Sequence, residues 1–216
     1  MYYSNMDGAT KPAATPPETT PPSAATPPAA AATTSASPPS PPATGTPQGF
    51  KLPITRMMPT DYSHVGQALV LKGYYGDQLC YSEATNWLVY NGSYYESSES
   101  ETRARGVAQK FTDLQLREVE AALKQCKALA KQSLTDQQKE DLKKTTKTME
   151  AYRSHVAQCR STGGITGALR ELRPMQLITV DDLDADPFLL NTPAGTVDLR
   201  TGKMLPHKSS DLITRQ

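Results

Sequence analysis

Residues 116–159 read LREVEAALKQCKALAKQSLTDQQKEDLKKTTKTMEAYRSHVAQC, and they set the architecture of this chain. Apolar side chains recur there at steps of three and four residues on both sides of Ser133-Leu134-Thr135, which indicates two helices that each bury one stripe. The two stripes are Leu116, Val119, Leu123, Cys126 and Ala130, and then Leu142, Thr145, Met149, Tyr152, Val156 and Cys159. Two helices joined by a short turn predict an antiparallel helical hairpin over residues 99–160.

The turn and the cysteines support this hairpin. Thr135 followed by Gln138 is a capping-box pair, which predicts the start of the second helix. Cys126 lies about two turns from the break and Cys159 about seven turns, so the two thiols cannot face each other across the hairpin. With Cys80 they show no metal-ligand spacing, so we expect small core residues in a reducing, cytoplasmic protein.

The outer faces of both predicted helices are rich in lysine. These residues are Lys124, Lys127 and Lys131 on the first helix and Lys139, Lys143, Lys144 and Lys147 on the second. One interpretation is a strip that contacts the phosphates of DNA. The other is a solvated face with Glu120–Lys124 and Glu140–Lys144 pairs at i, i+4, and we favour it because acidic residues interleave with the lysines.

Upstream of the hairpin the sequence predicts one helix and a small sheet. His64 to Tyr75 is the helix, with Asp61 near its N-cap, Gly76-Asp77 after its end, and an apolar stripe of Val65, Ala68, Leu69 and Leu71. Two or three strands follow, because Asn91-Gly92 between aromatic-rich runs is a strong hairpin signal. Aromatic rings in this window offer a stacking platform for single-stranded nucleic acid. The alternative, which we favour, is that these rings pair across strands and pack on the helices.

Downstream of the hairpin we expect a short helix and three strands. Ser161-Thr162 caps the helix and Pro174 ends it, and an extended run at residues 177–180 follows. The acidic run Asp181–Asp186 lacks the glycine and glutamate of a calcium loop, so a helix cap or polar turn is favoured. Residues 188–207 then predict strand, turn, strand, turn, strand.

The first 49 residues have a different composition from the rest. They hold twelve of the eighteen prolines and only Asp7, Lys11 and Glu18 as charges, so we expect a disordered Pro/Ala/Thr-rich arm before a domain over residues 50–216. The arm has PxxP spacing at residues 38–42, but no Arg or Lys beside it, so a plain spacer is favoured. The predicted class is therefore α+β, with small antiparallel β-hairpins packed with a long helical hairpin.

Several function classes are excluded by the sequence. The 23 basic and 22 acidic residues give a net charge of +1, which indicates no particular partner. No apolar run is long enough to span a bilayer, and the start lacks the pattern of a secretory signal. No nucleophile elbow, Gly-rich phosphate loop or metal-ligand set is present. The residues alone therefore predict an α+β module without a catalytic centre, a metal or a cofactor.

A resemblance goes further. The matching positions are Trp87-Leu88-Val89-Tyr90 with Gly92, and then Asp184, Asp186-Pro187, Leu190-Asn191, Gly195, Asp198-Leu199, Thr201-Gly202 and Pro206-His207. Over about residues 60–216 this pattern resembles the domain that precedes the superfamily 3 helicase in phage and plasmid primase–helicases, and poxvirus primase–helicases carry a similar domain. Two positions depart from it, with Tyr95 in place of Trp and Ala194 in place of Asn.

The resemblance implies a role in replicating a mobile element. In that family an ATPase that uses ATP and Mg²⁺ follows this domain and forms a hexameric ring on DNA. The chain ends at Gln216, before any phosphate loop, so we expect neither ATP hydrolysis nor primer synthesis from it.

Two functional hypotheses follow from these features. The first is a module that positions single-stranded or forked DNA, or the primase, at the helicase ring, with phosphate contacts and base stacking. The residues for these contacts are Lys124, Lys127, Lys131, Lys143 and Lys147 for phosphates, and Trp87 and Tyr95 for stacking. The second is a protein–protein scaffold in which the helical hairpin packs on a neighbouring subunit and DNA is contacted elsewhere.

Overall fold

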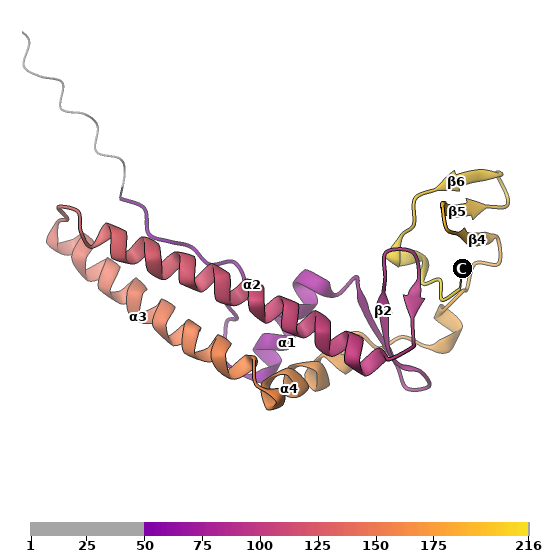
Figure 1. The fold of residues 1–216 in the computed structure, drawn as a ribbon, viewed down its shortest axis with the longest axis horizontal. Helices are drawn as coiled ribbons and strands as arrows, with labels where there is room; N and C mark the ends of the chain where they lie inside the picture. Colours follow the sequence, from indigo (N-terminus) through magenta and orange to yellow (C-terminus); the bar gives the residue numbers. More distant parts are fainter. Residues whose placement is uncertain (1–49, 216) are drawn as a thin grey trace, which may run out of the picture. The chain divides into compact units, whose positions relative to one another are not determined.

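The computed structural model describes residues 50–215 as an α+β structure, which confirms the predicted fold class (Figure 1). Its helices are α1 His64–Tyr75, α2 Ser100–Leu129, α3 Asp136–Cys159 and α4 Thr162–Leu172. Its strands are β1 Leu79–Ser82, β2 Asn86–Tyr90, β3 Tyr95–Glu96, β4 Leu189–Thr192, β5 Gly195–Asp198 and β6 Lys203–Leu205. The predicted arm over residues 1–49 lies outside the described residues. None of the helices in the described part has the length and apolar character needed to cross a bilayer.

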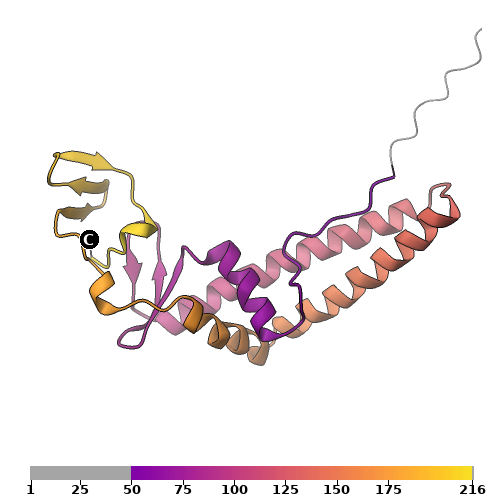
Figure 2. The same cartoon turned by 180° about the vertical axis from the view of Figure 1, so that it is seen from behind.

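The helical hairpin forms where the sequence predicts it. Helices α2 and α3 lie side by side in both views and are joined at residues 130–135 (Figures 1 and 2). The Thr135 hydroxyl accepts from the Gln138 amide at 3.3 Å, and the Gln138 side chain accepts from the Thr135 amide at 3.0 Å. This capping box satisfies amide groups that the first turn of α3 leaves without helical partners.

The buried stripe of α3 is the predicted one, but the stripe of α2 is rotated. Of the five residues predicted for α2, only Val119 and Cys126 are buried, whereas Leu116 and Leu123 are half-buried and Ala130 is exposed. The stripe that α2 buries along the hairpin is Thr112, Gln115, Val119, Ala122, Cys126 and Leu129.

An extended segment, residues 50–58, causes this rotation. It runs along α2 (Figure 2), and the Glu118 carboxylate accepts from the amides of Arg56 and Met57 at 2.6 and 3.1 Å. Phe50 and Leu52 pack against the buried cluster of Cys126, Leu129 and Leu142. Because α2 has this second neighbour beside α3, its most buried direction turns away from the seam that periodicity predicts.

The main core lies where α1, α4, the first sheet and the first half of α2 meet. Its fully buried side chains include Trp87, Phe111, Leu169 and Leu172. A buried pair of amide side chains fastens α1 to α2, because Gln67 donates to Gln115 at 2.7 Å and Gln115 donates back at 3.2 Å. Gln115 also donates to the Met57 carbonyl at 2.9 Å, so the same residue holds the extended segment.

Helix α1 has the predicted bounds, but part of its predicted apolar stripe is wrong. Ser63 is the N-cap and accepts from the Gly66 amide at 3.0 Å, while Asp61 lies near the cap, two residues earlier, and accepts from the Ser63 amide at 2.9 Å. Val65 and Leu69, which were placed in the apolar stripe, are about half exposed. The buried polar pair Gln67–Gln115 explains the shift, since it turns a polar residue of α1 toward the core.

The first sheet, β1-β2-β3, is antiparallel throughout. Its β2–β3 turn is the predicted Asn-Gly turn: the Asn91 side chain accepts from the amides of Ser93 and Tyr94 at 2.9 and 3.1 Å, and Gly92 has a φ of 106°. The extended run that follows α4 lies against the other edge, where the Ile178 amide donates to the Tyr81 carbonyl at 2.9 Å.

The second sheet, β4-β5-β6, confirms the predicted succession of strands and turns. Asn191 on β4 ties it to the first sheet, because its side-chain amide donates to the Ser93 carbonyl at 3.3 Å and to the Arg215 carbonyl at 3.0 Å. The Tyr95 amide on β3 donates to the Ile213 carbonyl at 2.7 Å. The segment around Ile213 therefore joins both sheets.

Candidate functional site

Trp87 and Tyr95, the two rings predicted to stack on bases, lie in the core. Trp87 is 0% exposed and Tyr95 is 2% exposed, so neither ring has a face available to a nucleic acid. They pack across strands instead: Tyr81 meets Trp87 edge-on at 5.3 Å between ring centroids, and Tyr90 meets Tyr95 at the same distance. The prediction that these two residues stack on bases is therefore wrong, and the rings form the cross-strand packing that was the favoured alternative.

The hydroxyl of Tyr95 shows the same structural role. It donates to the Asp77 carbonyl at 2.8 Å, at the end of the turn that follows α1. Burial of this ring raises the pKa of its hydroxyl far above the usual value, and the neighbouring Cys80 thiol adds to the shift. The hydroxyl therefore stays protonated and acts as a fixed hydrogen-bond donor inside the fold.

The five lysines predicted to contact phosphates are all exposed. They are Lys124, Lys127, Lys131, Lys143 and Lys147. Among the described residues none of the five forms an ion pair, whereas Lys139 pairs with Asp136 at 2.9 Å and Lys144 pairs with Glu140 at 4.0 Å. The predicted Glu140–Lys144 pair is therefore present, and the predicted Glu120–Lys124 pair does not form.

Four of these five lysines surround hollows between α2 and α3. The larger hollow, of about 580 Å³, lies at the closed end of the hairpin, and a smaller one of about 250 Å³ lies farther along α2. The larger is lined by Ala130, Gln132, Leu134, Lys139, Leu142, Lys143, Thr146, Lys147 and Glu150. The smaller is lined by Glu120, Leu123, Lys124, Lys127 and Arg153.

Both hollows lie on one side of the hairpin. Leu123 and Ala130 are seven residues apart and so share one face of α2. Glu118 and Gln125, also seven apart, bind the extended segment through the Arg56 amide and the Lys51 carbonyl. At about 100° per residue, these two faces point in roughly opposite directions. We call the two hollows together the open groove, because residues 50–58 cover the other side.

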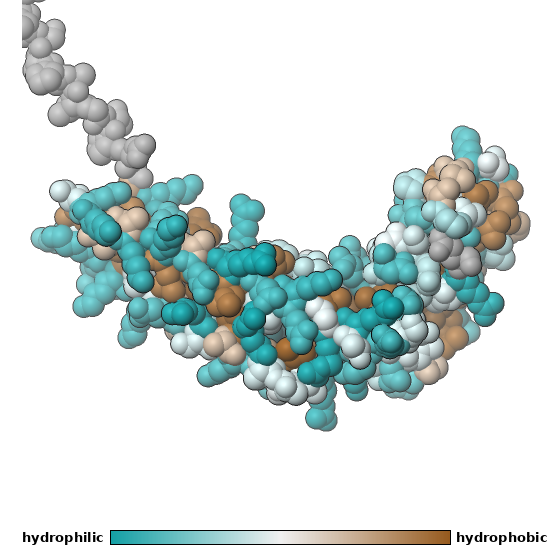
Figure 3. All heavy atoms as spheres, viewed as in Figure 1, coloured by the Kyte–Doolittle hydropathy of each residue, from teal (hydrophilic) through white to brown (hydrophobic). Residues whose placement is uncertain are grey.

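The open groove combines an apolar floor with a basic rim. Its floor is formed by Leu123, Ala130, Leu134 and Leu142. Six basic and two acidic side chains line it, namely Lys124, Lys127, Lys139, Lys143, Lys147 and Arg153 against Glu120 and Glu150. Figure 3 shows hydrophobic residues exposed along the hairpin among hydrophilic side chains. The periodic pattern alone could not reveal this surface, since it predicted that Leu123 and Ala130 would be buried.

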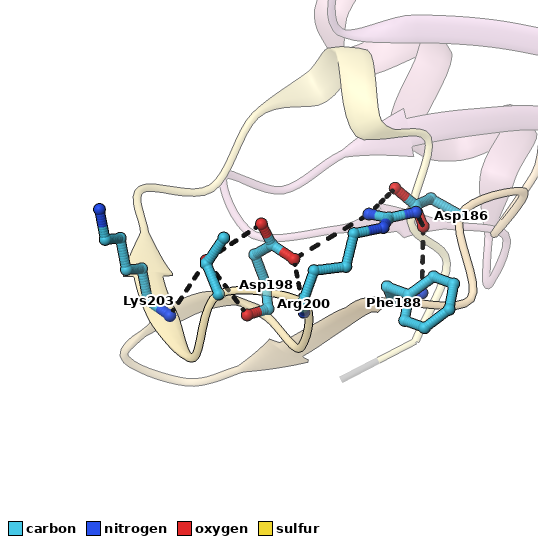
Figure 4. A network of polar contacts seen from close by, with 6 residues as sticks. Asp186, Phe188, Asp198, Arg200 and Lys203 are labelled. Atoms are coloured by element: carbon cyan, nitrogen blue, oxygen red, sulfur yellow. Dashed lines mark hydrogen bonds and ion pairs between the residues drawn. The ribbon is translucent and has the colours of Figure 1, made fainter.

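The acidic residues of the C-terminal motif hold turns together. Asp186 accepts two hydrogen bonds from the Arg200 guanidinium at 2.9 and 2.8 Å, and this guanidinium lies 4.3 Å from the centre of the Phe188 ring (Figure 4). Hydrogen bonding from Arg200 lowers the pKa of the Asp186 carboxyl. Asp198 accepts from the Arg200 amide at 2.9 Å and from the Thr201 hydroxyl at 3.1 Å.

Two more residues of the acidic run, Asp182 and Asp184, are also structural. The Asp182 carboxylate accepts from the amide and hydroxyl of Thr179 at 2.8 and 2.7 Å, and Asp184 accepts from the Thr214 amide at 2.9 Å. Within residues 50–215 no group of three or more His, Cys, Asp or Glu side chains is arranged to hold a metal ion. The acidic run is thus the cap and polar turn that the sequence favoured.

One thiol–imidazole contact lies where α3 ends. The Cys159 sulfur is 3.2 Å from His155 Nε2, and Tyr62 stacks on His155 at 4.5 Å between ring centroids. Burial raises the pKa of the Cys159 thiol to about 11 and lowers the pKa of His155. A protonated thiol beside a neutral imidazole is a poor nucleophile, so this pair belongs to the core. Cys80, Cys126 and Cys159 are all buried and free, as predicted.

Comparison with known proteins gives one clear result. A family model described as D5 N terminal like matches residues 68–216, which is more than half of the chain. The match begins within α1 and includes both sheets, α4 and the whole helical hairpin. No curated protein matches the chain.

Proposed function

The chain belongs to the D5 N-terminal-like family, a domain of primase–helicases, and we propose that it is a non-catalytic replication module that couples to a helicase through its helical hairpin. The open groove carries this proposal. In this hairpin Leu123 and Leu134 are only partly buried and lie between basic side chains at the hollows. Exposed apolar surface with a polar rim is typical of interaction sites.

In this function the ATP and Mg²⁺ chemistry belongs to the helicase partner. The partner is a superfamily 3 helicase, expected as a hexameric ring, and the module works beside it in the cytoplasm. The main core around Trp87 stabilises the domain, while the hairpin presents the open groove.

Complex formation with the helicase of the same replication system tests this proposal. We expect one complex by size-exclusion chromatography with light scattering, and we expect Lys143→Glu with Lys147→Glu to weaken it, since reversed rim charges meet the partner's surface. Lys144→Glu is the matched control, because this neighbouring lysine does not line the groove and already pairs with Glu140. A helicase that forms no complex with the unaltered chain would contradict the proposal.

A second candidate function is the positioning of single-stranded or forked DNA. The observation that favours it is the set of five exposed lysines without ion pairs among the described residues. Contacts to phosphates release counterions, so the affinity must fall steeply with salt. Titration of labelled single- and double-stranded DNA at two salt concentrations, with the five lysines changed to glutamine, tests this function. An affinity that is flat with salt would exclude the lysines as the site.

A further inference from the structure

The floor of the open groove has the spacing of a helix-binding surface. On α2, Leu123 and Ala130 lie seven residues apart, with Leu116 seven residues before them, and all three are at least partly exposed. A spacing of seven residues places side chains along one face of a helix, as at one position of a helix–helix seam. Leu142 on α3 and Leu134 in the turn complete the floor at the closed end. Two helices with an apolar strip between them offer the position of a third helix.

The basic side chains at the rim of the open groove indicate the charge of its occupant. Six basic and two acidic side chains line the open groove, and Lys124, Lys127, Lys143 and Lys147 have no ion-pair partner within the described chain. Because complementary charge stabilises an interface and like charge opposes it, the occupant carries acidic side chains beside its apolar stripe.

We infer that the open groove is the docking site for an acidic amphipathic helix of a partner protein. The inference rests on the coupling function proposed above and gives the chemistry of the partner's contact. From Leu116 to Ala130 the partly exposed apolar line on α2 is about 21 Å long, so a helix of about 14 residues covers it.

Three other occupants fit the groove less well. A second copy of this chain would place one lysine rim against another. A nucleic acid strand would use aromatic rings for stacking, and none is present among the residues that line the two hollows. Residues 1–49 contain twelve prolines and only two acidic side chains, a composition that does not supply an acidic helix.

The test uses the full chain and a labelled synthetic peptide of about three heptads, with Leu at its a and d positions and Ala and Glu elsewhere. Fluorescence anisotropy at low and high salt measures the affinity. A scrambled peptide of the same composition and a peptide with Lys in place of Glu are the probe controls. We expect binding of the acidic helix alone, weakened by salt.

Paired variants of the chain assign the site. Lys143→Glu with Lys147→Glu reverses the rim, and Ala130→Glu places a carboxylate on the floor, so each should weaken binding about tenfold or more. Lys144→Glu and Ala128→Glu are the controls, since both residues are exposed and neither lines a hollow. They should change the affinity less than about twofold. All five positions are on the surface, and circular dichroism checks that the fold is kept.

Two results would overturn the inference. One is an acidic helix that does not bind at low salt, and the other is a lysine peptide that binds equally well. Single-stranded DNA that binds and loses its affinity in the rim variant, while the peptide stays unbound, would assign the groove to nucleic acid.

A helicase that binds the chain while the acidic peptide does not bind would overturn this inference and leave the proposed function standing. A peptide that binds while the helicase does not would have the reverse meaning.

Discussion

Two regions of the molecule share α2 but use it differently. One is the base, formed by α1, α4, the first sheet and the first half of α2, and the other is the outer half of the helical hairpin, formed by α2 beyond Leu116 and by α3 before Arg153. In the base, Ala104, Val107, Ala108 and Phe111 form a broad buried surface against α1, α4 and the first sheet. In the outer half, α2 buries a narrower stripe between α3 and residues 50–58 and leaves Leu123 partly exposed. The base therefore supplies the stability of the fold, and the outer half supplies surface for a partner.

Loss of the central ring of the base should have the largest effect. Trp87→Ala removes a fully buried side chain, so we expect the free energy of unfolding to fall by about 3–5 kcal/mol. Chemical denaturation followed by circular dichroism measures it. Trp87→Phe should recover most of the loss, because Trp87 Nε1 has no hydrogen-bond partner among the described atoms. A small effect of Trp87→Ala would mean that the base is not the stabilising region.

The buried amide pair connects the two regions and should rank second. Gln115→Ala leaves the Gln67 side chain unsatisfied in the core, so we expect a loss of about 1–3 kcal/mol in the same measurement. Gln125→Ala is the matched control, since its bond to the Lys51 carbonyl is exposed and should contribute less than about 0.5 kcal/mol. Equal losses for the two variants would show that the buried pair has no special role.

A change confined to the outer half should have a smaller effect. Thr135→Ala removes the hydroxyl that accepts from the Gln138 amide, which is one of the two hydrogen bonds of the capping box. We expect the free energy of unfolding to fall by about 1 kcal/mol. Amide hydrogen exchange should rise in the first turn of α3 and stay constant in the base. Thr148→Ala, at an exposed position within α3, should leave the exchange of that turn unaltered. Faster exchange in the base would indicate that the regions unfold as one unit.

The burial of His155 should give the stability of the fold a weak pH dependence. Burial lowers the pKa of His155 in the folded state, despite an opposing contribution from Asp61 and with a further lowering by His64. The unfolded chain, with a histidine pKa of about 6.5, therefore binds the proton first as the pH falls. This contribution to stability is present above that pH and is lost below it, toward the lowered pKa of the folded state. In thermal unfolding between pH 5 and 8, His155→Phe should flatten the acidic side, and an unchanged profile would contradict this origin.

Local signals predicted most of the fold because the residues that carry them act on their own neighbours. The bounds of α1, the Thr135–Gln138 capping box and the Asn91-Gly92 turn each depend on a few adjacent residues. The rotated stripe of α2 depends instead on residues 50–58, about 60 positions away in the chain. Helical periodicity describes one helix and one partner, so it cannot include this third element.

The candidate site was only partly predictable for the same reason. Composition identified the exposed lysines of the hairpin correctly, since a charged helix face is solvated in any packing. The spacing of the sequence also predicted that Lys144 lies beside Glu140, since an i, i+4 pair forms within one helix, but only the packing of the hairpin places Lys143 at a groove. The burial of Trp87 and Tyr95 also depends on which face of the sheet the helices cover.

The central claim is that the outer half of the hairpin binds a partner while the base holds the fold. Residue-resolved hydrogen exchange of the full chain, with and without the acidic helical peptide, tests it most directly. We predict that amides gain protection in α2 beyond Leu116 and in α3 before Arg153, while those of α1, α4 and the first sheet stay unchanged. Protection that appears first in the first sheet, or nowhere, would contradict the claim.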